Sequence, residues 1–214
     1  MRTILSKFFL IFILPISVFS QENDFQTWTS ISASKKIIKK KNLTIKQGVR
    51  FRENSSLYSK LFTDLKIKSK YNKHFSFAIG YRFSNDRDKQ LELSQKNRFY
   101  SDIYYKDKYK KRFLFDTRAR LQTQGNIEGY AATFRQKSAM AYNIPKTKLE
   151  PSVALEYFLP FESMLIEKLR YTIGLSHPIT KDLDAEIAYR IQQEFYTDNP
   201  VTLFIFEGKL SYDF

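Results

Sequence analysis

One histidine and one serine, His74 and Ser76, stand two residues apart and could do chemistry together. A histidine beside a hydroxyl side chain can activate a serine as the nucleophile of a hydrolase. Both residues belong to a run that alternates in polarity, so on a β-strand they share one face. A competing interpretation is simpler, because a histidine at the start of a strand beside a turn is more often structural.

A second set of candidates consists of charged residues in the middle of predicted strands. They alternate with apolar residues, which places them on the polar face of each strand. In a closed barrel that face lines the lumen, and its excess of positive charge would favour anions, unless the charges pair and fill the interior. The predicted lumenal residues are Arg50, Arg52, Lys66, Arg82, Asp102, Asp116, Arg118, Arg120, Arg135, Glu156, Arg170, Glu186 and Arg190.

The elements that must position these residues are alternating stretches separated by turns. In the clearest one, residues 75–83, one face carries aromatic and branched residues without any charge. Such a row needs a partner sheet in water, whereas in lipid it needs none. Eleven stretches of this kind occur in the sequence. Because a closed antiparallel barrel needs an even number of strands, we expect ten or twelve.

The last stretch, residues 201–214, ends on an aromatic residue. The closing strand of a bacterial outer-membrane barrel commonly does the same, and the barrel-assembly machinery reads that residue. Leu210, Tyr212 and Phe214 alternate on one face and form the predicted assembly signal. Gly208 stands six residues before the end, one position away from the commonest pattern.

The first twenty residues predict a cleaved secretory signal peptide. Two positive charges, Arg2 and Lys7, precede an apolar run at residues 8–19, which is shorter than the roughly 20 residues of a membrane-spanning helix. We therefore expect a signal peptide at residues 1–20 and one outer-membrane β-barrel domain at residues 21–214. The sole tryptophan, Trp28, lies near the start of that domain, either as an anchor at the membrane interface or as a packed aromatic residue.

Composition narrows the class of protein. The chain has no cysteine and two histidines, and it has neither a phosphate-binding loop nor a dinucleotide motif, so we expect no metal and no cofactor. A net charge of +14 would suggest nucleic acid for a cytosolic protein, but the export signal argues against that partner. A mean hydropathy of −0.44 excludes a helical membrane protein, and 16% aromatic residues suit strands.

Several short segments share a pattern with known sequences: the signal peptide, Trp28 and residues 50–52, 81–83, 118–120, 156–158 and 170–192. Together they resemble an uncharacterised outer-membrane family, the domain of unknown function 2490, which is found mainly in Bacteroidota. The resemblance covers nearly all of the chain after the signal peptide. It implies a β-barrel in the outer membrane, and it implies no catalytic residue and no substrate.

These observations predict an all-β protein, a transmembrane antiparallel up-and-down barrel of about 10–12 strands in the cell outer membrane. We expect a non-enzymatic barrel with a basic lumen, serving as a narrow pore or in a structural or solute-binding role. Its expected partners are outer-membrane lipids and lipopolysaccharide, the barrel-assembly machinery and small anionic solutes.

Two alternatives remain open. One is an outer-membrane lipid-modifying hydrolase that uses His74 and Ser76, although their strand face should point inward, away from lipid. The other is a soluble exported β-barrel or β-sandwich binding protein.

Overall fold

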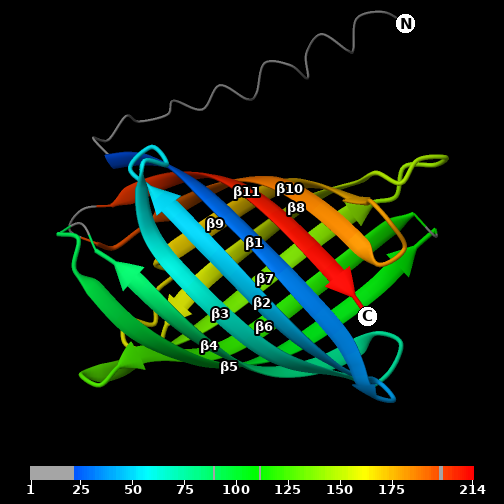
Figure 1. Ribbon diagram of the computed structural model, residues 1–214, viewed down its shortest axis with the longest axis horizontal. Coiled ribbons are helices and arrows are strands. Elements are labelled where there is room, and N and C mark those ends of the chain that lie inside the picture. The colour runs from blue at the N-terminus through cyan, green and yellow to red at the C-terminus, as the bar shows by residue number, and fades with distance from the viewer. Residues whose placement is uncertain (1–21, 89, 111, 198–199) are drawn as a thin grey trace, which may run out of the picture.

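The computed structural model describes residues 22–88, 90–110, 112–197 and 200–214, and the predicted signal peptide lies outside these ranges. Among the described residues, no helix is long and apolar enough to span a membrane. The described chain forms eleven strands (Figure 1). They are β1 (Glu22–Ile38), β2 (Lys41–Arg52), β3 (Leu57–Lys70), β4 (Phe75–Arg87), β5 (Leu93–Tyr109), β6 (Phe113–Asn126), β7 (Gly129–Tyr142), β8 (Glu150–Pro160), β9 (Lys168–Pro178), β10 (Leu183–Glu194) and β11 (Val201–Asp213).

The strands form one closed barrel in which each strand is hydrogen-bonded to its neighbours in sequence. All of these sequential pairs are antiparallel. The barrel closes between β1 and β11, which run parallel from Glu22 beside Val201 to Ser34 beside Asp213. The all-β barrel is therefore confirmed, whereas the expected even number of strands is wrong. An even number is required only if every neighbouring pair is antiparallel, and one parallel pair lets an odd number close.

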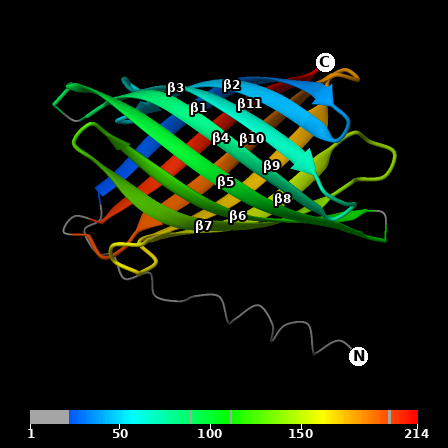
Figure 2. The same ribbon diagram turned by 90° about the horizontal axis from the view of Figure 1, so that it is seen from below.

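The odd number of strands separates the two ends of the barrel chain. Figures 1 and 2 show the start of β1 at one rim and the C-terminus at the opposite rim. We name the rim where β11 ends the C-terminal rim, and the other one the N-terminal rim. The backbone N–H of Phe214 donates to the carbonyl of Ser34 at 2.8 Å, so the last residue is tied to β1.

The wall has an inverted polarity compared with a water-soluble protein. Large apolar side chains are exposed on the outside, and the most open examples in the middle of strands include Ile79 at 65% and Ile173 at 60%. Charged side chains are buried inside, with Asp102 only 1% exposed and Glu156 4% exposed. The outward positions of the described strands, followed through the register, hold no Lys, Arg, Asp or Glu except near the two rims.

Two glycines on the inner face make room for aromatic rings. A Cβ atom at Gly48 would overlap the ring of Phe62, its cross-strand neighbour on β3, and a Cβ atom at Gly80 would overlap the ring of Tyr100 on β5. The outer end of each ring therefore lies close to the backbone of the adjacent strand. The glycines are needed for this close approach and not for an unusual backbone angle, since no glycine has a positive φ.

We expect Gly80→Val to lower the free energy of unfolding by roughly 1–3 kcal/mol, because the ring of Tyr100 must move out of its place. The fluorescence of the sole tryptophan during urea unfolding in lipid vesicles would measure this. Gly208→Val is the matched control, since a Cβ atom there meets nothing within 4 Å. Equal stability of the two variants would contradict the expected packing role of Gly80.

Candidate functional site in the barrel lumen

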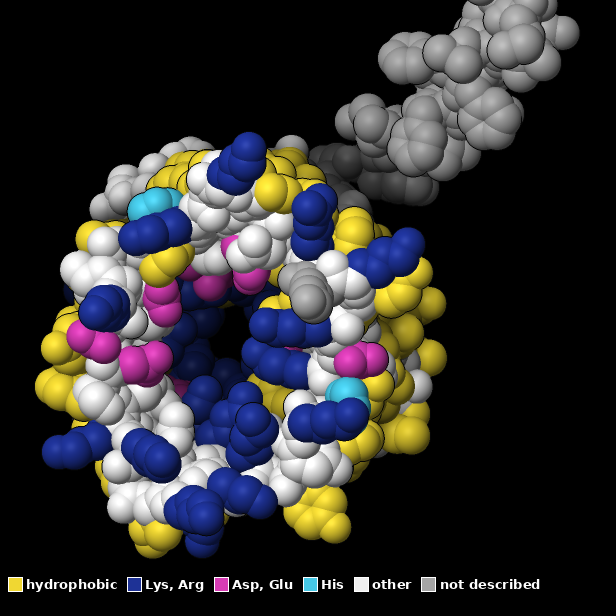
Figure 3. All heavy atoms as spheres, turned by 90° about the vertical axis from the view of Figure 1, so that its right-hand side faces the viewer, with side chains coloured by type: hydrophobic (Ala, Val, Ile, Leu, Met, Phe, Trp, Pro, Cys, Tyr) yellow, Lys and Arg dark blue, Asp and Glu magenta, His cyan; other side chains and the backbone are white. Residues whose placement is uncertain are grey.

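The main interior feature is a cavity of about 890 Å³ inside the barrel. Sixteen lysines and arginines line it, against seven aspartates and glutamates. Figure 3 looks into the barrel from the C-terminal rim and shows a hollow whose wall is mostly lysine and arginine. A volume of this size is typical of sites for small molecules. The lumen is therefore the candidate site, and its chemistry is dominated by positive charge.

The structure places the predicted lumenal residues on the inner face, in two groups. The first group lies outside the cavity lining. In this group Asp102 pairs with Arg120, and Arg52, Asp116 and Glu186 lie toward the ends of the barrel. There Asp116 pairs with Lys106 at 2.9 Å and Glu186 with Lys209 at 2.7 Å. The others line the cavity itself: Arg50, Lys66, Arg82, Arg118, Arg120, Arg135, Glu156, Arg170 and Arg190.

One carboxylate, that of Glu156 on β8, holds three guanidinium groups. Arg118 and Arg135 reach its Oε1 at 2.5 and 2.7 Å, and Arg170 reaches its Oε2 at 3.1 Å. Arg170 donates in addition to Gln192. Neighbouring strands β6, β7, β8 and β9 are thereby joined across the inner face. The cluster carries three positive charges for one negative charge, so it remains cationic.

A second network on β3 to β6 is balanced in charge. Arg82 pairs with Asp64 at 2.8 Å, and the hydroxyl of Tyr100 donates to the other oxygen of Asp64 at 2.7 Å. Arg120 forms a bidentate pair with Asp102 at 2.6 and 2.8 Å, and its guanidinium lies over the ring of Tyr100. Such paired and stacked guanidiniums are held in fixed positions, so this wall of the lumen is rigid.

Two aromatic rings inside the lumen gather further arginines. The Arg50 guanidinium carbon lies 3.6 Å from the ring centroid of Trp28 and 5.6 Å from that of Phe62. Three more guanidiniums lie within about 6 Å of one of these two rings, the range of a cation–π contact. They belong to Arg82, over Phe62, and to Arg170 and Arg190, over Trp28.

Trp28 therefore does not act as an anchor on the outside of the barrel. It is 6% exposed, and its cross-strand neighbours Arg50 and Glu207 both line the lumen. Of the two interpretations left open, the packed aromatic is the one that the structure supports. The alternation around Trp28 is weak, with Thr27 and Thr29 on its opposite face, so it does not indicate which face of β1 is the inner one.

Sequence reasoning overlooked the aromatic part of the site. Phe62, Tyr100 and Phe158 sit on polar strand faces but were not among the predicted lumenal residues. A usable signal exists in the sequence, because an aromatic residue on a polar face opposite a glycine of the next strand indicates a ring lying inward. Gly48 opposite Phe62 fits this pattern. Glu207 on β11 was also missed, and its carboxylate pairs with Arg190 and with Lys209.

The structure does not bring His74 and Ser76 together as a catalytic pair. His74 precedes β4, and its ring stacks on Tyr105 with 5.7 Å between centroids. Its Nδ1 lies 3.1 Å from the carbonyl oxygen of Lys106 and 3.5 Å from a carboxylate oxygen of Asp107. No hydrogen bond joins His74 to Ser76 in the described part of the chain. Nor do the described residues contain a group of three or more His, Cys, Asp or Glu that could hold a metal ion.

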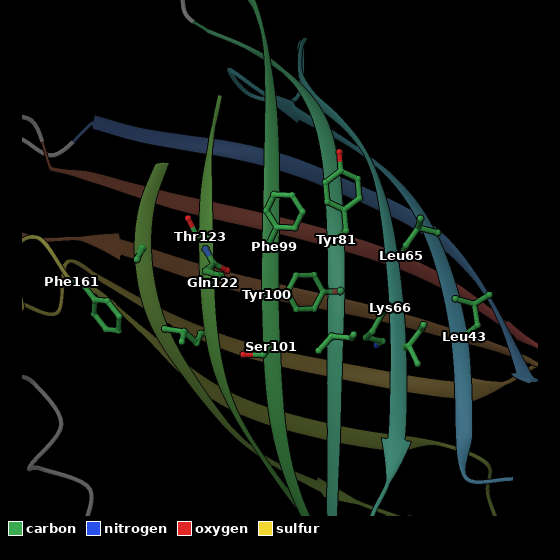
Figure 4. Close-up of a pocket in the computed structure, with 15 residues that line it drawn as sticks. Leu43, Leu65, Lys66, Tyr81, Phe99, Tyr100, Ser101, Gln122, Thr123 and Phe161 are labelled. Atoms are coloured by element: carbon green, nitrogen blue, oxygen red, sulfur yellow. The ribbon is translucent and has the colours of Figure 1, made fainter. Parts of the chain in front are cut away.

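The outer wall carries a separate apolar groove of about 720 Å³. Figure 4 shows Leu43, Leu65, Tyr81 and Phe99 side by side on the strands that form it, with Phe161 at one end. Its surroundings are those of the whole outer face, a surface of branched and aromatic side chains. The groove therefore belongs to the apolar exterior and not to the polar site in the lumen.

The predicted assembly residues lie on the outside near the C-terminal rim. Leu210 and Tyr212 are exposed on β11, and Phe214 follows the strand. The rings of Tyr212 and Phe214 meet edge to face with 4.7 Å between centroids. Together they form a compact apolar end on the closing strand.

Comparison with known proteins gives a family and a solved structure with a similar fold. No curated protein matches the sequence. Among solved structures, the β-domain of the Bordetella autotransporter BrkA matches with a TM-score of 0.49 and 8% identity, covering 77% of this chain and 78% of that one. The model of the family DUF2490, described as a protein of unknown function, matches residues 25–202. Because this match covers most of the chain, the protein belongs to the DUF2490 family.

Proposed function

We propose that the protein is an outer-membrane β-barrel whose basic lumen forms a narrow passage for small anions. The observation that carries this proposal is the inverted polarity of the wall. Exposed apolar side chains cover the outside of the strands, and buried charges line the inside. In water the outer surface would be unfavourable, whereas the hydrocarbon layer of a membrane solvates it.

The length of the strands supports a membrane location. They contain between 11 and 17 residues, and about 9–11 residues suffice for a tilted strand to cross a bilayer. A closed barrel also satisfies every strand edge, which the interior of a membrane requires. The outward positions without charges agree with contact between this surface and acyl chains.

The C-terminal rim supports contact with lipid head groups. Its turns and strand ends are rich in lysine, and the β1–β2 hairpin alone carries Lys35, Lys36, Lys39, Lys40 and Lys41. Lysines beside an apolar belt attract anionic lipids, including the phosphates of lipopolysaccharide wherever the rim faces them. We further propose that Leu210, Tyr212 and Phe214 are the residues that the barrel-assembly machinery recognises.

The preference for anions rests on the charges that remain after internal pairing. Asp64, Asp102, Glu156 and Glu207 each hold at least one arginine. In the described part of the chain, the lumenal Lys46, Lys66 and Lys137 have neither a hydrogen bond nor an ion pair. Free ammonium groups inside a narrow, low-dielectric tube raise the local concentration of anions and repel cations.

Conductance in a planar lipid bilayer with a salt gradient tests the proposal. We expect single-channel current steps of uniform size and a reversal potential shifted toward the equilibrium potential of the anion. The double variant Lys46→Gln with Lys137→Gln should reduce the anion preference, because these cations have no carboxylate partner that would be left unpaired. Lys148→Gln, in the exposed β7–β8 turn, is the matched control and should change little. Folded protein without conductance, or with cation preference, would overturn the proposal.

A further inference from the structure

We infer that the lumen contains a binding site for an oxyanion, a carboxylate or a phosphate group, centred on the guanidinium of Arg50 over Trp28. This inference deepens the proposed function and rests on it in one respect only, namely that solutes reach the lumen. It names a site and a class of ligand, where the proposed function names only a general preference for anions.

Arg50 stands out among the lumenal arginines that surround the two rings. In the described part of the chain, its guanidinium has no carboxylate partner, and its buried Nε atom has no hydrogen-bond acceptor. Its side chain nevertheless lines the cavity, so a solute in the lumen can reach it. A guanidinium held away from bulk water without a counter-charge is unfavourable, and a bound anion would remove that cost.

The arginines next to Arg50 have carboxylate partners, whereas Arg50 has none among the described residues. Arg82, Arg170 and Arg190 share the faces of Trp28 and Phe62 with it. Each of these three pairs with a protein carboxylate, that of Asp64, Glu156 or Glu207, although Glu156 and Glu207 also pair with other cations. Four guanidiniums thus gather over two rings, and the protein supplies anions for three of them. The fourth position is open to an anion from solution.

The position of Arg50 is built by the sequence around it. The guanidinium stacks on Trp28 with 3.6 Å between its carbon and the ring centroid. The ring of Phe62 lies against β2 only because Gly48, two residues before Arg50, has no side chain. Stacking leaves the edge of a guanidinium, with its N–H groups, free to donate. The two rings therefore hold Arg50 in place while leaving its donors for a ligand.

The chemistry of the ligand follows from the shape of the donor. A guanidinium presents parallel N–H groups in one plane, and these match two oxygens of a carboxylate or a phosphate. Chloride would accept from the same group without using this geometry. The second network provides no competing acceptor, because the carboxylates of Asp64 and Asp102 are already occupied. We therefore expect oxyanions to bind more tightly than halides.

The sole tryptophan provides a direct test. Trp28 lies under Arg50, so its fluorescence should change when an anion binds there. The folded protein in lipid vesicles would be titrated with inorganic phosphate and with acetate, at an ionic strength kept constant with sodium chloride. We expect a saturable change with both oxyanions. A fluorescence change that rises linearly with oxyanion concentration would overturn the site. So would the absence of any change when phosphate or acetate replaces chloride.

Three variants separate Arg50 from the general charge of the lumen. Arg50→Met removes the charge and should weaken phosphate binding at least tenfold. Arg50→Lys keeps the charge but loses the planar pair of donors, so it should bind phosphate more weakly than the wild type. This variant keeps the test valid if Arg50→Met fails to fold. Lys96→Gln removes another lumenal charge, outside the Trp28–Phe62 cluster, and should bind phosphate as the wild type does. Equal binding by Arg50→Met and the wild type would overturn the inference.

The conductance of the same preparations distinguishes the two proposals. Anion-selective current without saturable fluorescence would support the passage and overturn the Arg50 site. Saturable binding that Arg50→Met abolishes, in a barrel that passes no current, would support the site and overturn the passage.

Discussion

Replacing Glu156 by glutamine is expected to destabilise the barrel by about 3–5 kcal/mol, the usual loss when one partner of a buried ion pair is removed. The glutamine fits the same space and still accepts hydrogen bonds. However, the guanidiniums of Arg118, Arg135 and Arg170 would then share the inner wall without any carboxylate between them. Their mutual repulsion in a confined interior is the physical reason for the large effect.

The effect of Glu156→Gln is measurable as a shift in the urea midpoint of the tryptophan fluorescence in lipid vesicles. Glu186→Gln is the matched control, because the Glu186 side chain is 37% exposed and, among the described residues, forms an ion pair only with Lys209. We expect less than about 1 kcal/mol from the control. Adding Arg118→Gln to Glu156→Gln should recover part of the stability, since it removes one of the three facing charges. Equal midpoints for Glu156→Gln and Glu186→Gln would show that the cluster does not stabilise the barrel.

Placing a lysine on the outer wall should have the second-largest effect. Ile79 lies in the middle of β4 and is 65% exposed, among neighbours that are all uncharged on that face. In a bilayer, Ile79→Lys should cost roughly 2–4 kcal/mol, because the ammonium group must enter hydrocarbon near the midplane. In a water-soluble barrel the same change would be close to neutral, since the side chain already faces solvent.

Insertion into preformed lipid vesicles, followed as the fraction of protein that folds, checks the effect of Ile79→Lys. Tyr71→Lys is the control, because Tyr71 lies in the β3–β4 turn at the C-terminal rim, where a lysine reaches water. We expect the control to insert like the wild type and Ile79→Lys to insert much less. Equal insertion of both variants would argue for a soluble barrel.

The strands and their faces could be predicted from the sequence because a period of two is a local property. Each alternating stretch, such as residues 75–83, can be recognised without knowledge of its partners. The closing pair could not be predicted in this way. β1 and β11 are far apart in the chain, and nothing local in either strand specifies parallel pairing. The sequence shows eleven alternating stretches, but the assumption that all neighbouring strands are antiparallel led to an expectation of ten or twelve strands.

The partners within the lumen depend on the register of the barrel, which the sequence does not reveal directly. Alternation assigns Arg118, Arg135 and Glu156 to polar faces, but their meeting depends on how β6, β7 and β8 are staggered. The site around Arg50 is harder still to predict. It requires Trp28 to face inward, and the flanking threonines leave the orientation of β1 undecided.

The parallel closure of β1 onto β11 also decides where the two chain ends can be reached. The start of β1 and the end of β11 open onto opposite rims, so in a membrane they face different compartments. Of two peptide tags, one placed just before Glu22 and the other after Phe214, an antibody added to intact cells would then reach only one. Only one of the two would be cleaved by a protease added from outside.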